Sequence, residues 1–449
     1  MNNNNLPDIK KCSIAVIGLG YVGLPLALEI AKRDFCLLTK EKIFRKVIGF
    51  DINIERIEQL KKGLDRNNIY SKENLKVIKN IKYSNDIDLI KNCDVFIITV
   101  PTPINKNNEP DLNYLKDASI IVGNAIKNNN KNQIVIFEST VYPGATEEFC
   151  IPLIENISNK KYNNKEYKNS FYGGYSPERI NPGDTKHTIE TVIKITSGSN
   201  KDVSHWIDNF YKSFIKAGTF NVSSIKVAEA AKIIENTQRD INIALVNELS
   251  IIFKKMGIDF NEILNAANTK WNFQKYRPGL VGGHCIGVDP YYLTFKAKKI
   301  GLNPNLILAG RKINDGMHEY LLSQIISKIN QRSERIKIEK VLILGISYKE
   351  NCSDSRNSQL IYLVKNMLKM NMNITIVDPL VNPKSVVEKT GLNLLKNIPK
   401  NNKYSLIIFA LDHLQFKKIN YKELKNLSYS NTIIFDLTNR IVGEDIYHL

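Results

Sequence analysis

The sequence lacks the features expected of a membrane-inserted, exported or metal-stapled protein. No apolar run reaches the ~18 residues that span a bilayer, and residues 1–5 are not a basic segment followed by an apolar one. The six cysteines stand singly, without a Cys-x-x-Cys pair, which argues against a disulfide framework or a zinc site. We therefore expect a reduced, cytoplasmic protein with no membrane insertion and no bound metal.

A packed basic run is also missing, although the 449 residues carry a formal net charge of +18. The lysines are spread through Lys/Asn/Ile-rich segments such as 128–131 and 159–168 and do not gather into one packed run. A basic balance is compatible with nucleic acid, a membrane surface or anionic small molecules as partners. The scattered distribution favours a solvated surface, so nucleic acid is not an expected partner and polyanion binding is the minority interpretation.

A glycine-rich turn, Gly-x-Gly-x-x-Gly at 18–23, follows an apolar strand predicted over 13–17 and precedes a helix. Its first glycine permits the tight turn, its second lets the backbone approach a pyrophosphate, and its third lets the helix pack on the strand. The helix N-terminus that follows attracts phosphate. The predicted cofactor-binding residues of this turn are Gly18, Gly20, Tyr21, Val22 and Gly23.

An acidic residue, Asp51, ends a second apolar strand over 47–50. An acid there would hydrogen-bond the adenosine ribose and disfavour a 2′-phosphate, which predicts NAD rather than NADP. Asp51 lies 28 residues after Gly23, farther than usual, and 37–45 looks like a surface insertion. Arg56, a little over one helical turn later, either reaches the cofactor or faces water.

Polar loops follow the next two apolar strands, over 95–100 and 134–137, and contain Thr102 and Thr140. Because ligands of an open parallel sheet lie beyond the carboxyl ends of its strands, both threonines are placed to meet cofactor or substrate. Alternatively, each caps the helix that follows. Residues 173–183 are too rich in Gly and Pro for the interior of an element, and this predicted loop holds Glu178 beside the anion binder Arg179.

A stretch without Gly or Pro, 224–256, is apolar at helical spacing and is longer than a typical globular helix. Its length suggests a spine that links two lobes and a dimer interface. Lys232, Asn236 and Arg239 lie on one of its faces, since they are four and three residues apart. That face is either functional or the solvated stripe of an amphipathic helix.

A second glycine-rich stretch, 279–292, surrounds Cys285 with four glycines and places Asp289 four residues later. The backbone there can come close to a ligand while the thiol stays reachable. A reactive thiolate needs a lowered pKa or a nearby positive group, and Lys232 is the candidate partner. Alternatively, Cys285 is a small buried hydrophobe in a Gly-rich turn.

The strand pattern restarts near residue 340, after helices that run on through 305–328. Four further apolar strands are predicted over 340–345, 372–378, 405–410 and 432–436. The loop after the first of them places Lys349 and Arg356 at a switch-point crevice, whereas Cys352 in that loop has no paired acid or base. The fold class is therefore α/β, with two Rossmann-like doubly wound parallel-sheet domains joined by a long central helix and a helical dimerisation region. The predicted domains are 1–222, 223–332 and 333–449.

In this order the segments resemble the nucleotide-sugar 6-dehydrogenases, the UDP-glucose and UDP-N-acetylhexosamine dehydrogenase superfamily. The resemblance covers nearly the whole chain, and its most specific matches are 175–184, 227–240 and 282–292. They look like the branch that oxidises UDP-N-acetylglucosamine or UDP-N-acetylgalactosamine for surface polysaccharide, as in Vi-antigen-type and O-antigen pathways. Residues 272–278 and the Glu178-Arg179 loop differ from UDP-glucose enzymes, which favours a UDP-N-acetylhexosamine, with the gluco epimer slightly ahead. UDP-glucose and UDP-N-acetylmannosamine are the alternatives.

The resemblance implies a twofold oxidation of the sugar C6 from alcohol to carboxylate, with two NAD reduced per sugar. Cys285 would attack the intermediate aldehyde, and the thiohemiacetal would become a thioester that water cleaves. Lys232 and Asn236 would stabilise developing oxygen charge, and Asp289 would organise proton transfer and water. The remaining implied roles are catalysis for Glu178 and Thr140, cofactor binding for Thr102, Thr140 and Arg356, and substrate binding for Glu178, Arg179, Ile180, Lys232, Asn236, Arg239, Gly282, Tyr348 and Lys349. His284 either contacts the substrate or has a packing role within the protein.

Two rival hypotheses stay open at this point. A two-electron β-hydroxyacid-type dehydrogenase also joins a Gly-x-Gly-x-x-Gly lobe to a long helix, but it needs neither a thiol nor a second α/β lobe. A non-enzymatic dinucleotide-sensing or nucleic-acid-binding protein is suggested by the charge of +18 alone. The resemblance favours the enzyme, acting on a UDP-N-acetylhexosamine as a homodimer or higher homo-oligomer.

Overall fold

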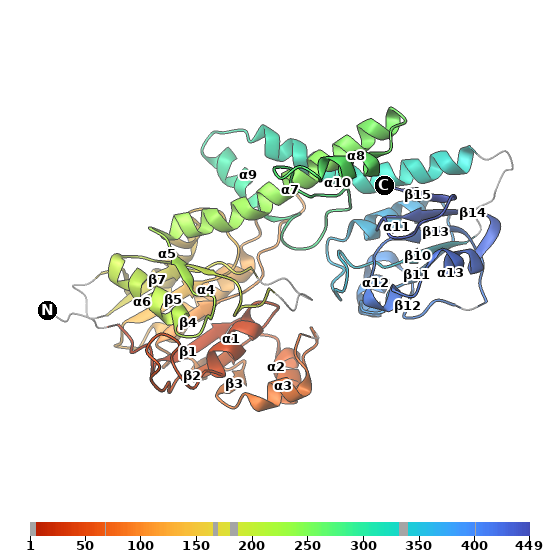
Figure 1. The fold of residues 1–449 in the computed structure, drawn as a ribbon. Helices are drawn as coiled ribbons and strands as arrows, with labels where there is room; N and C mark the ends of the chain where they lie inside the picture. Colours follow the sequence, from red (N-terminus) through yellow and green to blue (C-terminus); the bar gives the residue numbers. More distant parts are fainter. Residues whose placement is uncertain (1–5, 68, 165–168, 180–186, 332–339, 400) are drawn as a thin grey trace. The chain divides into compact units, whose positions relative to one another are not determined.

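The structure is a computed structural model that describes residues 6–67, 69–164, 169–179, 187–331, 340–399 and 401–449 (Figure 1). The chain forms two compact units. Unit 1 comprises Met1–Glu235 and Tyr291–Ile300, and unit 2 comprises Asn236–Pro290 and Gly301–Leu449. Helix α7 (Ile225–Lys255) continues from the first unit into the second, which confirms the long helix predicted over 224–256.

Unit 1 is built on a nine-stranded sheet. Its strands are β1 (Ser13–Ile17), β2 (Lys46–Phe50), β3 (Ile81–Ser84), β4 (Val95–Ile98), β5 (Gln133–Phe137), β6 (Lys161–Tyr162), β7 (Ser170–Tyr175), β8 (Lys194–Gly198) and β9 (Thr219–Asn221). Their order is β3-β2-β1-β4-β5-β7-β8-β9, with β6 beside β7, and among the described pairs β7 with β8 is antiparallel while the others are parallel. Because β1 lies between β2 and β4, the connections change direction there, which is where a doubly wound sheet binds its ligand.

Helices cover the sheet of unit 1, and their apolar sides supply the core. They are α1 (Gly23–Ala31), α2 (Ile54–Lys61), α3 (Lys72–Val77), α4 (Asn113–Ile126), α5 (Ile151–Ser158) and α6 (Lys201–Lys212), with the short turns η1 (Ile87–Leu89) and η2 (Thr146–Cys150). Alternate residues of β1, Ile14 and Val16, pack with α1 and with Phe210 of α6 in one buried cluster. Each such buried side chain contributes roughly 1.5–3 kcal/mol to folding.

Unit 2 holds a second, six-stranded and fully parallel sheet in the order β12-β11-β10-β13-β14-β15. The strands are β10 (Val341–Leu344), β11 (Ile374–Val377), β12 (Leu394–Leu395), β13 (Tyr404–Phe409), β14 (Ser428–Asp436) and β15 (Ile446–His448). One face packs against α10 (Asn305–Asn330) and α11 (Gln359–Lys369), and the other packs against Phe416 of η3 (Leu414–Phe416) and Leu424 of α13 (Tyr421–Asn426). The remaining helices of the chain are α8 (Phe260–Ala267), α9 (Asp289–Lys299) and α12 (Pro383–Thr390).

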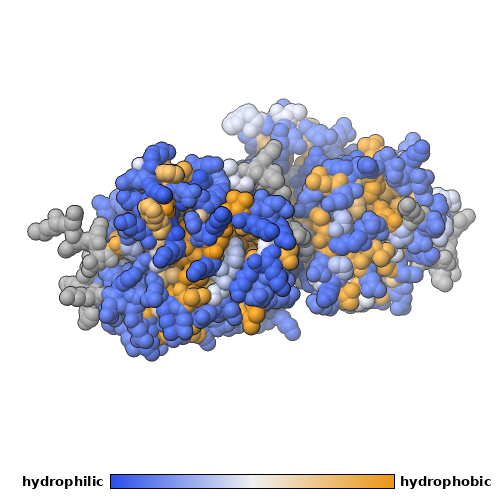
Figure 2. All heavy atoms as spheres, turned by 90° about the horizontal axis from the view of Figure 1, so that it is seen from below, coloured by the Kyte–Doolittle hydropathy of each residue, from blue (hydrophilic) through white to orange (hydrophobic). Residues whose placement is uncertain are grey.

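The predicted fold class, α/β with two Rossmann-like sheets and a long helix, is confirmed. All eight predicted strands exist, with small shifts at their ends. Figure 2 shows one face of the molecule, on which hydrophilic residues predominate and hydrophobic residues appear on both units. In the described part of the chain, no helix combines the length and apolar character that crossing a bilayer requires.

Two local expectations need correction or refinement. Gly173 and Gly174 were expected in a loop, but both belong to the fully buried strand β7. A Cβ on Gly174 would lie 2.1 Å from Ile207 of α6, so glycine is required here because α6 packs tightly against the strand. The predicted insertion 37–45 is mostly exposed, yet the Arg45 guanidinium lies 4.9 Å from the Phe210 ring, which anchors the segment to α6.

Candidate active site

The glycine turn of unit 1 has the shape that a dinucleotide requires. Gly18 has a φ of +93°, in the region that favours glycine. A Cβ on Gly23 would lie 1.9 Å from the Gly18 carbonyl oxygen, so α1 could not approach the turn with any other residue. Gly20 is exposed and a Cβ there would meet nothing within 4 Å, which leaves its backbone open to a ligand. The residues present therefore fit a pyrophosphate above this turn.

Asp51 and Arg56 both support that turn. Asp51, half-buried at the end of β2, accepts hydrogen bonds from the Leu19 N–H (2.8 Å) and the Asn53 N–H (2.9 Å). The alternative in which Arg56 faces water is wrong, because the side chain is fully buried. Its Nε donates to the Leu19 carbonyl (3.0 Å), and its Nη1 pairs with Asp65 (2.9 Å). Arg56 thus stabilises the glycine turn from the protein interior through the Leu19 carbonyl.

Neither predicted threonine caps the next helix. The N-cap of α4 is Leu112 and that of η2 is Ala145, and neither makes a side-chain cap. Thr102 and Thr140 are half-buried in the loops after β4 and β5, at the edge of the sheet where ligands bind. The hydroxyl that stabilises the turn belongs to Thr99, which donates to the Gly18 carbonyl at 2.7 Å and was not singled out from the sequence.

Glu178 belongs to a buried charge network that the sequence did not reveal. The Lys194 ammonium lies 3.1 Å from Glu178 and 2.6 Å from Glu138, and the Tyr211 hydroxyl donates to Glu138. Burial alone would lower the pKa of Lys194, but the two carboxylates raise it, so the ammonium stays charged. Lys194 thereby fixes the Glu178 carboxylate, which is only 7% exposed.

Lys232 is not part of a solvated stripe. Its side chain is 6% exposed and its Nζ donates a short hydrogen bond to the Glu178 carbonyl. Arg179, the neighbour of Glu178, forms an ion pair with Glu235 of α7. Arg239 is exposed, and Ile180 lies outside the described residues. Unit 1 therefore brings Lys232 and Glu178 together at the start of the long helix.

Cys285 is exposed, so the interpretation of a small buried hydrophobe is wrong. Its carbonyl accepts the backbone N–H of Asp289 at 2.8 Å, at the first residue of α9. The Asp289 carboxylate, 1% exposed, accepts a 2.5 Å hydrogen bond from the fully buried amide of Asn236. Unit 2 therefore brings the Asn236 amide to the Asp289 carboxylate, which follows the accessible thiol by four residues.

The loop before Cys285 is fastened to the loop after β10. A Cβ on Gly283 would lie 2.6 Å from the Tyr348 ring, so the two segments are in close contact. His284, whose role the sequence left open, places its Nε2 2.8 Å from the Asp354 carboxylate. Burial would raise the pKa of Asp354, but hydrogen bonds from His284 and Arg356 lower it. His284 thus connects the cysteine stretch to the loop after β10.

A cavity of about 160 Å³ lies in the same region of unit 2. Its lining includes Leu280 from the cysteine stretch and Ser347 and Tyr348 from the loop after β10. The predicted residues Lys349 and Gly282 are half-buried beside Tyr348, and Cys352 is buried, which raises the pKa of its thiol. Across the described residues, no group of three or more His, Cys, Asp or Glu side chains is arranged to hold a metal ion.

Three family models match the chain, and they decide its family. The UDP-glucose/GDP-mannose dehydrogenase family matches through its NAD binding domain over residues 12–215, its central domain over 226–316 and its UDP binding domain over 342–442. The chain belongs to this family. The predictions of a dehydrogenase that uses NAD and of a UDP-sugar as its class of substrate are confirmed at this level. Each matched range lies inside one of the three predicted domains, whose boundaries stay predictions.

Relatives in the family align over almost the whole chain. The UDP-N-acetyl-D-glucosamine 6-dehydrogenase of Salmonella typhi is 47% identical over 96% of this chain and 96% of its own. The enzyme of the same name from Pseudomonas aeruginosa is 45% identical over 96% and 97%. Among solved structures, the UDP-D-ManNAc dehydrogenase of Pyrococcus horikoshii is similar with a TM-score of 0.80 and 28% identity, covering 97% of this chain and 98% of its own.

Proposed function

We propose that this chain oxidises C6 of UDP-N-acetyl-D-glucosamine from alcohol to carboxylate, for surface polysaccharide, with two NAD consumed per sugar and no metal. The exposed thiol of Cys285 carries the proposal, and four residues later the Asp289 carboxylate accepts a hydrogen bond from Asn236. The two relatives at 45% and 47% identity, both named for this substrate, support the choice of sugar. The UDP-N-acetyl-D-mannosamine dehydrogenase of Pyrococcus horikoshii is 32% identical to this chain, so UDP-N-acetylmannosamine is less well supported as the substrate than UDP-N-acetyl-D-glucosamine.

Unit 1 would bind the cofactor through the backbone of the glycine turn and through Asp51, with Thr102 and Thr140 beside it at the carboxyl ends of β4 and β5. When bound, NAD supplies the acceptor for the hydride that leaves C6 in each of the two oxidations. Arg56 contributes indirectly, since its guanidinium is buried and holds the Leu19 carbonyl.

The first oxidation leaves an aldehyde at C6. The Cys285 sulfur adds to its carbon, and the resulting thiohemiacetal loses a hydride and a proton to become a thioester. Water then cleaves the thioester, which releases the carboxylate and restores the thiol. We assign Lys232 and Asn236, one helical turn apart in α7, to the negative charge that develops on the C6 oxygen. Asp289 and Glu178 are assigned to proton transfer and to the hydrolytic water.

Residues of unit 2 would bind the UDP moiety. Tyr348 and Lys349 follow β10, at the sheet edge where an open α/β sheet binds ligands. Gly282 lets the cysteine stretch lie against them, and Arg356 presents a half-exposed guanidinium from the same loop. Arg179 and Arg239 are further candidates for the phosphates. The lysine and arginine charges suit a diphosphate, which unit 2 would hold while C6 reacts.

We further infer that the protein is a homodimer or a higher homo-oligomer. Apolar residues of α7 are exposed at Val227, Ile234, Leu245 and Ile252. Their spacings of seven and eleven residues are close to whole helical turns, so they form one stripe along the helix. An exposed apolar stripe of this length is typical of a surface that another chain covers, and a second copy meets it symmetrically.

The proposal is tested by measuring NADH formation with UDP-N-acetylglucosamine, UDP-N-acetylgalactosamine, UDP-N-acetylmannosamine and UDP-glucose. We expect the highest kcat/KM with the first sugar and two NADH per sugar consumed. Cys285→Ala should form no uronic acid, whereas Cys352→Ala, a change at a buried cysteine of the same unit, should retain the acid product.

Other results would identify a rival function. One NADH per turnover would indicate a two-electron dehydrogenase of the hydroxyacid type. No turnover of any UDP-sugar, together with polyanion affinity that falls steeply with salt, would indicate a binding protein. Uronic acid formed by Cys285→Ala at the wild-type rate would exclude the thioester route.

A further inference from the structure

We propose that His413 is a positioning residue for the UDP-sugar: together with Asp378 it fixes the loop over residues 346–351 and, with it, Lys349. The inference rests on the proposed function, because it assigns Lys349 to substrate. His413 and Asp378 lie outside the segments 175–184, 227–240 and 282–292 that carry the resemblance. Neither side chain is accessible to a ligand, since both are 0% exposed. Their effect on substrate must therefore act through the loop.

The two sheets share one turn geometry. Gly18 and Gly345, which follow β1 and β10, have φ values of +93° and +96°. In unit 1 the next N–H, that of Leu19, donates to Asp51 at 2.8 Å. In unit 2 the corresponding N–H of Ile346 donates to Asp378 at 2.9 Å, and in both units donor and acid are 32 residues apart. Asp378 therefore occupies the place that a ribose-binding acid has in a dinucleotide site.

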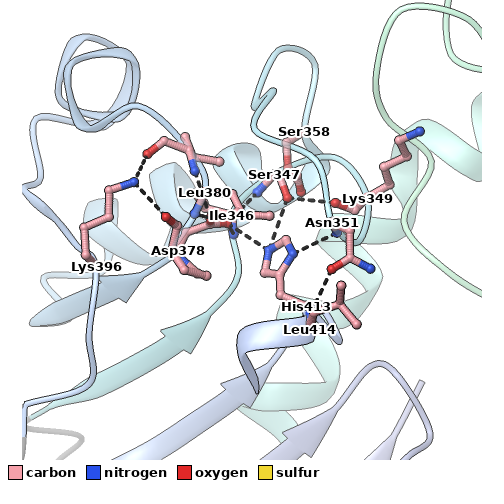
Figure 3. Close-up of polar contacts among 12 residues, drawn as sticks. Ile346, Ser347, Lys349, Asn351, Ser358, Asp378, Leu380, Lys396, His413 and Leu414 are labelled. Atoms are coloured by element: carbon pink, nitrogen blue, oxygen red, sulfur yellow. Dashed lines mark hydrogen bonds and ion pairs between the residues drawn. The ribbon is translucent and has the colours of Figure 1, made fainter. Parts of the chain in front are cut away.

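The environment of the two acids is different. Asp51 is half-buried, whereas Asp378 is fully buried and has the His413 imidazole against it, with Nε2 3.2 Å from its Oδ2 (Figure 3). Burial would raise the pKa of Asp378, but the hydrogen bond from His413 lowers it, so the carboxylate is charged. Because Asp378 is fully buried and hydrogen-bonded to His413, it is not accessible to a ribose, and the turn of unit 2 can serve another ligand.

The second ring nitrogen of His413 holds the loop itself. The Asn351 N–H donates to Nδ1 at 2.9 Å, so Nδ1 carries no proton and Nε2 is the nitrogen that donates to Asp378. Asn351 has a φ of +54° and accepts the Leu414 N–H on its Oδ1 at 2.8 Å. The start of the loop, at Ile346, is held by Asp378 and its end by His413.

Between these two fixed points lie the residues assigned to substrate. The Ser347 hydroxyl donates to the Lys349 carbonyl at 2.8 Å and lies 3.4 Å from His413 Nε2. Figure 3 shows the Lys349 side chain directed away from the His413–Asp378 pair, while its backbone stays tied to Ser347. Ser347 and Tyr348 also line the cavity of about 160 Å³. Release of the Asn351 N–H would let the loop, and the Lys349 ammonium with it, move relative to that cavity.

Three substitutions separate the two contacts of His413. In His413→Asn, the amide oxygen takes the place of Nδ1 and still accepts the Asn351 N–H. In His413→Gln, the amide N–H takes the place of the Nε2–H and still donates to Asp378. His413→Ala removes both hydrogen bonds. We expect His413→Ala and His413→Gln to raise the KM for the UDP-sugar, and the dissociation constant of UDP measured by calorimetry, by about tenfold. His413→Asn should stay within about threefold of the wild type, and the KM for NAD should stay within about twofold in all three variants.

A purely structural role predicts a different pattern. In that case the thermal midpoint falls in all three variants while the KM for the UDP-sugar and the UDP affinity stay at wild-type values, and this result would overturn the proposal. Equal loss of affinity in His413→Asn and His413→Gln would also overturn it. If the wild type turns over no UDP-sugar, the proposed function fails, but UDP titrations of the wild type and the His413→Asn and His413→Gln variants still decide the role of His413.

Discussion

One of the six cysteines differs from the other five in its exposure to solvent. Cys285 is exposed, whereas the other five are each 4% exposed or less. Burial raises the pKa of Cys12 and Cys93 to about 12, which keeps those thiols protonated. Cys36 is the exception: burial would raise its pKa, but hydrogen bonds from Thr39 lower it. Cys285 is therefore the accessible cysteine, whereas Cys36 is a buried cysteine with a lowered pKa, and a reagent can tell whether accessibility decides reactivity.

We expect iodoacetamide to alkylate Cys285 of the native protein at least about tenfold faster than any other cysteine, because the reagent must reach the sulfur. Peptide mass spectrometry at successive times measures the labelling of each site. Saturation with UDP-sugar should slow the labelling of Cys285. Denaturation is the control, since it should bring all six sites to similar rates. Faster labelling of Cys36 than of Cys285 in the native protein would contradict the assignment of the accessible nucleophile.

At the scale of single elements, α7 also holds a loop of unit 1 through Glu229. This fully buried carboxylate accepts the N–H groups of Gly144 (2.5 Å) and Thr146 (2.9 Å), in the segment that follows Thr140. Burial raises the pKa of Glu229 from 4.5 to about 7, although the hydrogen bonds from Thr146 and Gly144 lower it. Because the folded chain holds the proton more tightly than the unfolded chain, the stabilisation is complete below about pH 4.5 and is lost as the pH rises through about 7.

We therefore predict that Glu229→Gln, which cannot ionise, gains stability relative to the wild type as the pH rises from 5 to 8. One pKa unit corresponds to about 1.4 kcal/mol, so the relative gain approaches about 3 kcal/mol. The measurement is the difference between the two thermal midpoints at each pH, which cancels the titration of all other groups. Glu147→Gln, at a neighbouring and more exposed carboxylate, is the matched control. A difference that stays constant between pH 5 and 8 would contradict the buried ionisation.

The sequence predicted those elements whose signal is local. Apolar runs identified the central strands of both sheets, and the glycine turn at 18–23 identified the first crossover. Strand β7 was missed because Gly173 and Gly174 are typical of loops. In the folded chain Tyr162 and Ile151 lie close to Gly173, and Ile207 of α6 lies close to Gly174, so both positions are crowded. The edge strand β3 is short and half-exposed, so no apolar run marks it.

Some residues of the site also have a local signal in the sequence, and others do not. Cys285 and Asp289 could be singled out because they stand four residues apart in one glycine-rich stretch, and Asn236 because it shares a helical face with Lys232. Only the family resemblance joined the three. Lys194 lies 16 residues from Glu178, and its strand β8 is the neighbour of β7. His413 lies 35 residues from Asp378, and the strands that precede them, β13 and β11, are the two neighbours of β10. No periodicity within a segment records such a pair. The supporting residues of the site therefore became visible only in the folded chain.

For the whole molecule, α7 differs from an ordinary surface helix because some of its polar residues are buried and some of its apolar residues are exposed. Its buried positions include Glu229, Lys232, Asn236 and Asp240, whereas Leu245 is 52% exposed. These charges and amides can be buried because each has a hydrogen-bonding or ion-pair partner. Several apolar residues of the same helix face outward. A surface helix with this pattern is expected to be covered by a second copy of the chain.

We predict that Leu245→Glu and Ile252→Glu convert a dimer into a monomer. Each removes an apolar side chain worth roughly 1.5–3 kcal/mol when buried and adds a charge, so dimer affinity should fall by at least about tenfold per copy of the interface residue. Light scattering after size-exclusion chromatography should give twice 51.2 kDa for the wild type and 51.2 kDa for the variants. Val442→Glu, at an apolar residue that is 89% exposed in unit 2, should remain a dimer. A wild-type mass of 51.2 kDa at micromolar concentration, or dimers in all three variants, would show that the α7 stripe is not the contact, and the apolar side of that helix would then need another occupant.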